Sequence, residues 1–303
     1  MPSIKQIIGA VALGFATASS ALPLAARQNP TTGLPDGLTD VDVLQFALTL
    51  EFLESAFYQQ GFAKFADSDF AALGLDEEDL TNLKGVGATE DLHVDLLLSA
   101  IAATGQQPVA PCTYDFKFTD AAGMVATAAI LEQVGVSAYL GAAPILASPD
   151  ILTTAAEILT VEARHQTFIR TASKAIAVPS AFDTPLGIRS VFTLAAGFIT
   201  ACPAGSNLAI TPFSEVTMAD TQATVVSGST LQLTTTATGA TFCGFTNGGQ
   251  TGGTAFTAFA NGACVAPSNL AGAVYVHLTN AAPATGVLTD AIVVAGPMVV
   301  VVS

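Results

Sequence analysis

The 303-residue chain carries 9 Lys and Arg against 24 Asp and Glu, which gives a formal net charge of -15 at pH 7. Such a surface repels phosphate backbones and anionic lipid, so we expect no nucleic-acid partner. Hydrophobic residues make up 51% of the chain, which allows a large core and excludes a disordered chain. Charged residues make up only 11%, which indicates either widely buried helices or membrane contact.

The first segment has the form of a secretory signal peptide. Lys5 precedes a short apolar run, and small residues follow, with Ser19 and Ala21 placed as at a cleavage site. We therefore expect residues 1–21 to be removed and the mature protein to be secreted. The alternative is an N-terminal membrane anchor, for which the apolar run is short.

Apolar residues recur with helical spacing between about residues 40 and 177, and this spacing predicts four helices. They are expected at residues 40–62, in a stretch that ends near 103, at 119–146 and at 149–176. Asp40 or Asp42 is expected to begin the first helix, and Thr119 and Asp150 are candidate N-caps of the last two.

The lengths of the connections predict how these helices are arranged. Only "ASPD" separates the last two, so they must be antiparallel neighbours. The 15 residues from Gly105 to Thr119 can span roughly 50 Å at about 3.3 Å each, which is enough to run the length of a helix. We therefore expect a four-helix bundle with one long crossover, closed by a further apolar helix from Ile188 to Ala201.

Each predicted helix carries one candidate glutamate within apolar sequence: Glu51, Glu90, Glu132 and Glu162. The third helix is apolar on every face, and Glu132 is its only charge after Asp120. A carboxylate in such a helix must be buried, which is costly unless a cation or metal compensates it. An ion pair with Arg164 or Arg170 is the alternative to a metal.

Two tyrosines divide the helices into similar pairs. Tyr58 lies seven residues after Glu51, and Tyr139 lies seven after Glu132. Seven residues are two helical turns, so each Tyr shares a helix face with its Glu and is expected to donate a hydrogen bond or pack in the core. Glu54 is an alternative to Glu51, which the tyrosine spacing favours.

The other two helices carry Glu-x2-His pairs. His93 follows Glu90 by three residues, and His165 follows Glu162 by three. Two similar hairpins facing each other would bring four carboxylates and two imidazoles together in the core. Four negative charges balance two divalent cations, and mixed oxygen and nitrogen ligands favour iron or manganese.

This set of four Glu and two His resembles the dimetal carboxylate site of the ferritin-like superfamily. The segments "LEFLESAFYQQGF" and "TVEARHQTFIR" resemble its secreted branch, which includes plant desiccation-related and fungal stress-response proteins. The resemblance covers about residues 40–200. It implies that Glu90 and Glu162 bridge the two ions, that Glu51 and Glu132 are terminal ligands, and that each ion binds one histidine.

From about residue 207 the chain is rich in Thr, Val, Gly and Ser, which predicts an Ig-like β-sandwich. His277 alternates with apolar neighbours and is expected to face solvent. The terminal run "AIVVAGPMVVVVS" has two interpretations. It resembles a glycolipid-anchor signal, but its Gly296-Pro297 step favours a bulged edge strand.

Four cysteines and the expected secretion predict two disulfides. Cys112 and Cys202 flank the bundle, whereas Cys243 and Cys264 lie in the sandwich. Of the three pairings that four cysteines allow, we therefore expect one bridge within each domain.

The sequence thus predicts an all-α ferritin-like four-helix bundle at residues 40–203 and an all-β sandwich at 207–303 that contacts a partner, a cell wall or a cell surface. No transmembrane span is expected in the mature chain. Two functions are open: an oxidoreductase whose metals react with O2 or peroxide, and a non-catalytic metal-binding or stress-protective surface protein with a vestigial site.

Overall fold

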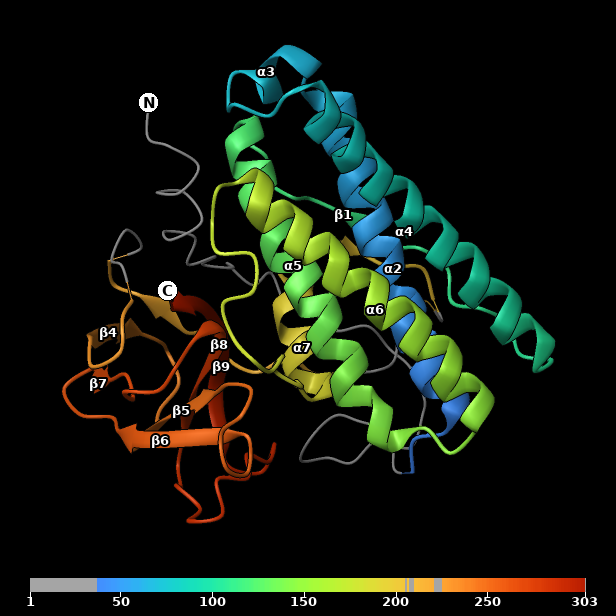
Figure 1. Ribbon diagram of the computed structural model, residues 1–303. Coiled ribbons are helices and arrows are strands. Elements are labelled where there is room, and N and C mark those ends of the chain that lie inside the picture. The colour runs from blue at the N-terminus through green and yellow to red at the C-terminus, as the bar shows by residue number, and fades with distance from the viewer. Residues whose placement is uncertain (1–36, 205, 207–209, 221–224, 303) are drawn as a thin grey trace.

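The computed structural model describes residues 37–204, 206, 210–220 and 225–302. It contains a helical bundle and a β-region that packs against one side of the bundle (Figure 1). The predicted signal peptide, residues 1–21, lies outside the described residues.

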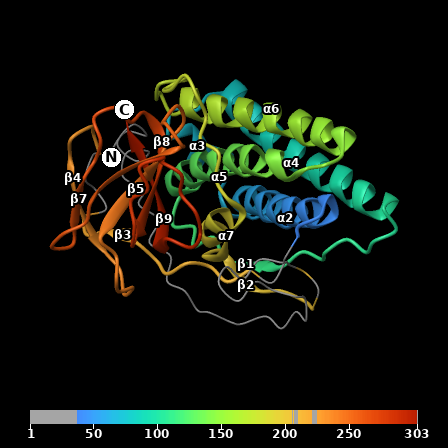
Figure 2. The same cartoon turned by 90° about the horizontal axis from the view of Figure 1, so that it is seen from below.

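Two long helical hairpins form the bundle. Helices α2 and α4 lie against each other, as do α5 and α6 (Figures 1 and 2). A short helix, α3, lies in the first hairpin, a 3-10 turn, η1, follows α5, and α7 closes the side toward the β-region. The helices are α2 Asp40–Lys64, α3 Asp67–Ala71, α4 Glu77–Ala103, α5 Ala121–Ala142, η1 Ala143–Ile145, α6 Pro149–Ala172 and α7 Ile188–Ala196.

The first helix begins at Asp40, as predicted, and the preceding residue, Thr39, is its N-cap. The backbone N–H of Thr39 donates to Asp42 Oδ2 at 2.8 Å, and its hydroxyl accepts from Asp42 N at 3.3 Å. This reciprocal pair satisfies backbone groups that a helix start leaves open. Asp40 instead accepts hydrogen bonds from the backbone N–H groups of Ala147 and Ser148, both at 2.8 Å. It therefore ties α2 to the turn between α5 and α6.

The predicted N-caps of the last two bundle helices are each displaced. Asp120, rather than Thr119, caps α5 by accepting from the N–H of Gly123 at 2.7 Å. Ser148, rather than Asp150, caps α6, because proline at position 149 suits the first helical turn and lets the cap fall one residue before it.

Helix α4 contains two glycines, Gly85 and Gly87, and neither interrupts it. The helix starts at Glu77, well before both of them. A Cβ on Gly87 would come within 2.8 Å of the Cβ of Tyr58 on α2. Gly87 therefore allows α2 and α4 to approach closely at the height of Tyr58.

Helix α5 is the core helix of the bundle (Figure 2). Among the described residues, the segment Ala121–Ile145 is long and apolar enough to cross a membrane, and 83% of its most apolar window is buried inside the protein. The apolar character of this segment is therefore explained by its burial as the core helix of the bundle.

The long crossover between α4 and α5 contains strand β1, Thr113–Tyr114, which pairs with β2, Ile199–Ala201. This pairing explains why α7 ends at Ala196 rather than at the predicted Ala201. The disulfide between Cys112 and Cys202 joins the same two segments, as predicted. The crossover is therefore held to the chain that follows α7.

The β-region has two antiparallel sheets, as predicted for a sandwich. A three-stranded sheet has the order β3-β4-β7, and a four-stranded sheet has the order β6-β5-β8-β9. The disulfide between Cys243 of β5 and Cys264 of β7 joins the sheets and confirms the second predicted bridge. The strands are β3 Thr217–Met218, β4 Thr230–Thr234, β5 Phe242–Thr246, β6 Thr254–Ala258, β7 Ala263–Val265, β8 Gly272–Thr279 and β9 Val293–Val302.

The apolar terminal run forms β9 at the edge of the four-stranded sheet. Its pairing with β8 shifts register beside Gly296, whose φ of 95° favours glycine. Met298, Val300 and Val302 lie in the sandwich core. This packing agrees with the edge-strand interpretation of the run.

His277 does not face solvent, which corrects the prediction. Its side chain is 0% exposed, and its Nε2 lies 3.1 Å from the hydroxyl of Ser190 on α7. On the same face of β8, the hydroxyl of Tyr275 lies 2.6 Å from that of Ser137 on α5. The bundle covers this face of the sheet, so alternation along β8 does not indicate exposure.

The two disulfides should stabilise the fold unequally. Replacing Cys243 and Cys264, which are 21 residues apart, by Ala should lower the free energy of unfolding by about 3 kcal/mol. Replacing Cys112 and Cys202, which are 90 residues apart, should lower the free energy of unfolding by about 4 to 5 kcal/mol. This disulfide closes a longer loop and therefore restricts the unfolded chain more. Urea unfolding followed by circular dichroism measures both. Unchanged midpoints would contradict the expectation.

Candidate metal centre

The six residues predicted as metal ligands lie together inside the bundle. They come from all four long helices, and none is more than 8% exposed. They are Glu51 of α2, Glu90 and His93 of α4, Glu132 of α5, and Glu162 and His165 of α6.

These residues form two overlapping groups, each of which could hold a metal ion. In each group, one ligand atom per residue lies within 4.8 Å of all the others. The first group is Glu51, Glu90, His93 and Glu162, and the second is Glu90, Glu132, Glu162 and His165. The two groups share Glu90 and Glu162, the residues that the resemblance assigned as bridging.

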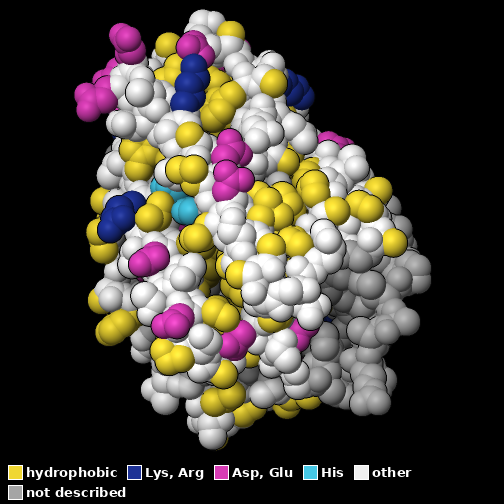
Figure 3. Space-filling model, turned by 90° about the vertical axis from the view of Figure 1, so that its right-hand side faces the viewer, with side chains coloured by type: hydrophobic (Ala, Val, Ile, Leu, Met, Phe, Trp, Pro, Cys, Tyr) yellow, Lys and Arg dark blue, Asp and Glu magenta, His cyan; other side chains and the backbone are white. Residues whose placement is uncertain are grey.

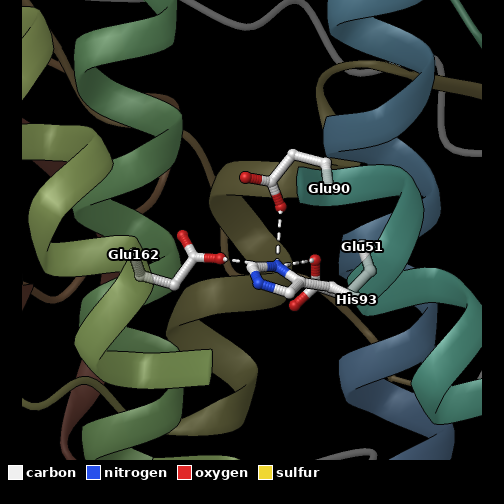
Figure 4. Close-up of side chains that lie close together, drawn as sticks. All are labelled: Glu51, Glu90, His93 and Glu162. Carbon is white, nitrogen blue, oxygen red and sulfur yellow. Dashed lines mark hydrogen bonds and ion pairs between the residues drawn. The ribbon is translucent and has the colours of Figure 1, made fainter. Parts of the chain in front are cut away.

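The His93 ring lies at the centre of the first group (Figure 4). Its Nδ1 is 3.0 Å from Glu90 Oε2, 3.3 Å from Glu51 Oε2 and 3.3 Å from Glu162 Oε1. Carboxylates from α2, α4 and α6 therefore converge on one imidazole nitrogen.

His165 has the corresponding position in the second group. Its Nδ1 lies 2.8 Å from Glu90 Oε1 and 3.1 Å from Glu132 Oε2. Its other nitrogen, Nε2, lies 2.8 Å from the hydroxyl of Thr89. The His165 and His93 rings are stacked with their centroids 6.0 Å apart. The Nδ1 distances show that both imidazoles turn Nδ1 toward Glu90, which the two groups share.

Two tyrosines hold the remaining carboxylates by hydrogen bonds that cross between helices. Tyr58 of α2 donates to Oε1 of Glu132 on α5. Tyr139 of α5 donates to Oε1 of Glu51 on α2 at 2.5 Å. Burial and the neighbouring carboxylates raise the pKa of both tyrosines well above the ordinary value. Both phenols therefore remain protonated donors, each serving the glutamate of the other helix.

Glu54 is a further carboxyl group in the same region of the core. It is 5% exposed, and its pKa is raised by burial and by the charge of Glu162. A Cβ on Gly135 would lie 2.5 Å from Glu162 Oε2 and 3.3 Å from Glu54 Oε1. Gly135 therefore leaves the space that these two carboxyl groups occupy. Glu51, and not Glu54, belongs to the ligand groups.

Crowding in the buried core changes the pKa values of the groups. Burial and the charge of Glu132 raise the pKa of Glu90 to about 7. Burial alone would lower the pKa of both histidines, but hydrogen bonds to the carboxylates outweigh it and raise the pKa to about 12 for His93 and about 9 for His165. The metal-free centre therefore keeps protons that isolated side chains would lose.

Four buried carboxylate oxygens accept no aligned hydrogen bond of their own from a described residue: Glu51 Oε2, Glu90 Oε1 and both carboxylate oxygens of Glu162. Three of them lie 2.8 to 3.3 Å from an imidazole Nδ1 that already hydrogen-bonds another carboxylate oxygen, so each of the three shares its donor. Buried polar atoms of this kind are costly unless something else satisfies them. All four belong to the ligand groups, so the cluster fits bound cations.

The arginines predicted as alternative partners of Glu132 do not reach it. Arg164 is exposed, and Nε of the buried Arg170 donates to the carbonyl of Ile176 at 2.6 Å. Glu132 instead contacts Tyr58 and His165. The alternative of an ion pair between Glu132 and Arg164 or Arg170 is therefore wrong.

Comparison with known proteins agrees with this geometry. Residues 39–175 match the family model of the ferritin-like domain, a range that includes the four long helices and all six predicted ligands. The chain therefore contains a ferritin-like domain, followed by the β-sandwich.

The chain is also similar to a curated protein, "Protein rds1" of Schizosaccharomyces pombe. The two are 28% identical over 167 residues, which are 54% of this chain and 40% of the relative. The match thus covers less than half of that relative's length.

Sequence reasoning missed three contributors to the centre. Thr89 contacts His165 across helices, and no spacing signal indicates that contact. The sequence indicates Glu54 only as an alternative to Glu51, whereas the structure buries both side chains. The position of Gly135, three residues after Glu132 in a buried helix, is a signal that a close approach occurs there.

The metal-free protein should lose stability as the pH rises. The pKa of Glu90 is about 7, above the 4.5 of an ordinary Glu. The contribution of Glu90 to the free energy of unfolding is therefore fully present below pH 4.5 and is lost as the pH rises through 7. The pKa of His165 is about 9, above the ordinary 6.5, so its contribution is lost as the pH rises from 6.5 through 9.

Thermal melts of chelated protein between about pH 6.5 and 9 measure this loss. Burial lowers the pKa of His277 to about 3, so this residue costs stability only below about pH 6.5, outside that window. We expect a lower Tm at pH 9 than at pH 6.5 and a smaller difference after divalent metal is added. A Tm that is constant or rises with pH would be incompatible with the crowded carboxylates.

The crossed tyrosine hydrogen bonds should tune metal affinity. In Tyr139→Phe, Glu51 loses its only phenolic donor, and metal binding should weaken by about 10- to 100-fold. Tyr114→Phe is the matched control, because the Tyr114 hydroxyl accepts from Cys112 N in the crossover, outside the centre. Competition titration with a coloured chelator measures both variants, and equal affinities would exclude this role for Tyr139.

Proposed function

We propose that the bundle holds two iron or manganese ions in a secreted protein, and that this centre is an oxidoreductase site that reacts with O2 or peroxide. One observation carries the proposal. Four buried oxygens of Glu51, Glu90 and Glu162 that have no hydrogen-bond donor of their own lie in two groups that share Glu90 and Glu162. Two cations between these groups would satisfy all of them.

The chemistry of the ligands supports the choice of metal. Carboxylate oxygens with one imidazole nitrogen per ion suit iron or manganese better than metals that prefer thiolates. All four cysteines are in disulfides, so they offer no thiolate. When bound, iron or manganese would supply one-electron chemistry with O2 or peroxide.

The surrounding residues would orient the ligands. Nδ1 of each histidine faces the carboxylates and would be the ligand atom. Nε2–H of His165 would then donate to the Thr89 hydroxyl, which lies 2.8 Å away and would fix the tautomer. Tyr58 and Tyr139 would each hold one oxygen of a terminal carboxylate and leave the other for metal.

Access to the centre is narrow. The His93 and His165 side chains are 10% and 7% exposed, and Figure 3 shows histidine atoms at the surface among hydrophobic side chains. Glu90 and Glu162, which would bridge the two ions, are 0% exposed. A diatomic or similarly small oxidant therefore fits this entrance better than a bulky substrate.

The low exposure of the centre also favours the alternative function, a non-catalytic metal-binding or stress-protective protein at the cell surface. Such a protein would retain its ions without turnover. Two disulfides are compatible with an extracellular protein in either case. In both, the β-sandwich would supply contact with a cell wall or another surface.

Anaerobic reconstitution followed by elemental analysis tests the proposal. We expect about two ions of iron or manganese per wild-type chain. Glu162→Gln should remove at least half of this metal, because Glu162 belongs to both groups. Glu157→Gln, an exposed change on the same helix, should remove none. Absence of iron and manganese from the reconstituted wild type would exclude the proposal.

Histidine variants and a turnover assay complete the test. His165→Ala should lower metal content by about half or more, because one ion loses its nitrogen ligand. His277→Ala should leave metal content unchanged, although it should lower Tm because His277 is buried. Consumption of O2 or peroxide by metal-loaded wild type distinguishes the two functions. Full metal content with no consumption would favour the non-catalytic one.

A further inference from the structure

A cleft lies beside the α5–α6 hairpin, where the bundle meets the β-region. Its volume is about 190 Å³, enough for more than one water molecule. Helices α5 and α6, the segment 177–184 and residues 271–273 line it. None of the six predicted metal ligands lines this cleft.

Two buried amides in its wall have no partner. Gln133 of α5 is 7% exposed, and Gln166 of α6 is 8% exposed. Both line the cleft, and neither side chain has a hydrogen-bond partner among the described residues. Their amide atoms are not among the fully enclosed polar atoms without a partner in the described residues, so they open into the cleft. Two free carboxamides that open into one cleft offer donors and acceptors to a ligand that forms hydrogen bonds.

The rest of the lining indicates the charge of that ligand. No Lys, Arg or His lines the cleft, whereas hydroxyl groups of Thr167 and Ser180 and the half-buried carboxyl group of Asp183 do. An anion would meet Asp183 without a compensating cation. Carboxamides and hydroxyls both donate and accept, which suits a neutral ligand with several hydroxyl groups.

The rim adds an apolar surface. Phe182 lines the cleft and is 64% exposed. Exposed aromatic rings beside convergent polar groups are a common arrangement in small-molecule sites. The C–H face of a sugar ring or cyclitol could pack on Phe182 while its hydroxyls reach the two amides.

We propose that this cleft binds a neutral polyhydroxy compound of monosaccharide or cyclitol size, with Gln133 and Gln166 as its principal hydrogen-bond partners. The binding does not depend on the metal centre. The two sites are nevertheless adjacent along the chain, because Gln133 follows Glu132 and Gln166 follows His165.

Calorimetric titration of the full chain with D-glucose and with myo-inositol tests this site. We expect at least one of them to bind, in both metal-free and metal-loaded protein. Gluconate, an anion of similar size, should bind at least tenfold more weakly. Failure of both neutral probes to bind at 20 mM, or tighter binding of gluconate, would overturn the proposal.

Amide variants locate the binding. Gln133→Met and Gln166→Met keep approximate side-chain volume and remove the hydrogen bonds, so each should weaken binding by about tenfold. Gln232→Met, an exposed change on β4, should have no effect. Unchanged affinity in both cleft variants would overturn the proposal.

Thermal melts separate this role from a structural one. Because neither amide has a protein partner, the Met variants should have a Tm equal to or above that of the wild type. A Tm lowered by several degrees would show that the amides stabilise the protein and would contradict the assignment. If a variant does not fold, the titration of wild type with the three probes still decides.

Discussion

The structure depends on the burial of several carboxyl groups at one point in a low-dielectric core. Desolvation and mutual repulsion raise the pKa of Glu54, Glu90 and Glu162. Two imidazoles and two phenols compensate part of this charge, but four carboxylate oxygens have no hydrogen-bond donor of their own. The bundle therefore carries an energetic cost that protons or cations must offset, and cations offset it most completely at neutral pH.

The remainder of the fold closes the bundle around this point. The crossed bonds from Tyr58 and Tyr139 couple the two hairpins through the glutamates that they hold. The crossover is joined to the segment after α7 by β1, β2 and a disulfide. Helix α7 and the four-stranded sheet cover the side of α5 away from α6, where Ser137 contacts Tyr275.

Spacing along the helices was sufficient to predict the bundle, its hairpins and the six clustered residues, because charge in an all-apolar helix has few physical explanations. The displaced N-caps of α5 and α6 are local errors of one or two residues, whereas the other failures come from contacts between distant segments. His277 is buried because α7 covers β8, and Thr89 reaches His165 across helices. Pairing of β1 with β2 ends α7 early. Local patterns do not contain these tertiary contacts.

The central claim is that two cations lie between the groups that share Glu90 and Glu162. Anomalous X-ray diffraction from crystals of metal-loaded protein, recorded at the iron and manganese absorption edges, tests it most directly. The account predicts two anomalous peaks inside the bundle, one within bonding distance of His93 and the other of His165, with both shared glutamates between them. Crystals of protein exposed to both metals that show no peak at this position would contradict it.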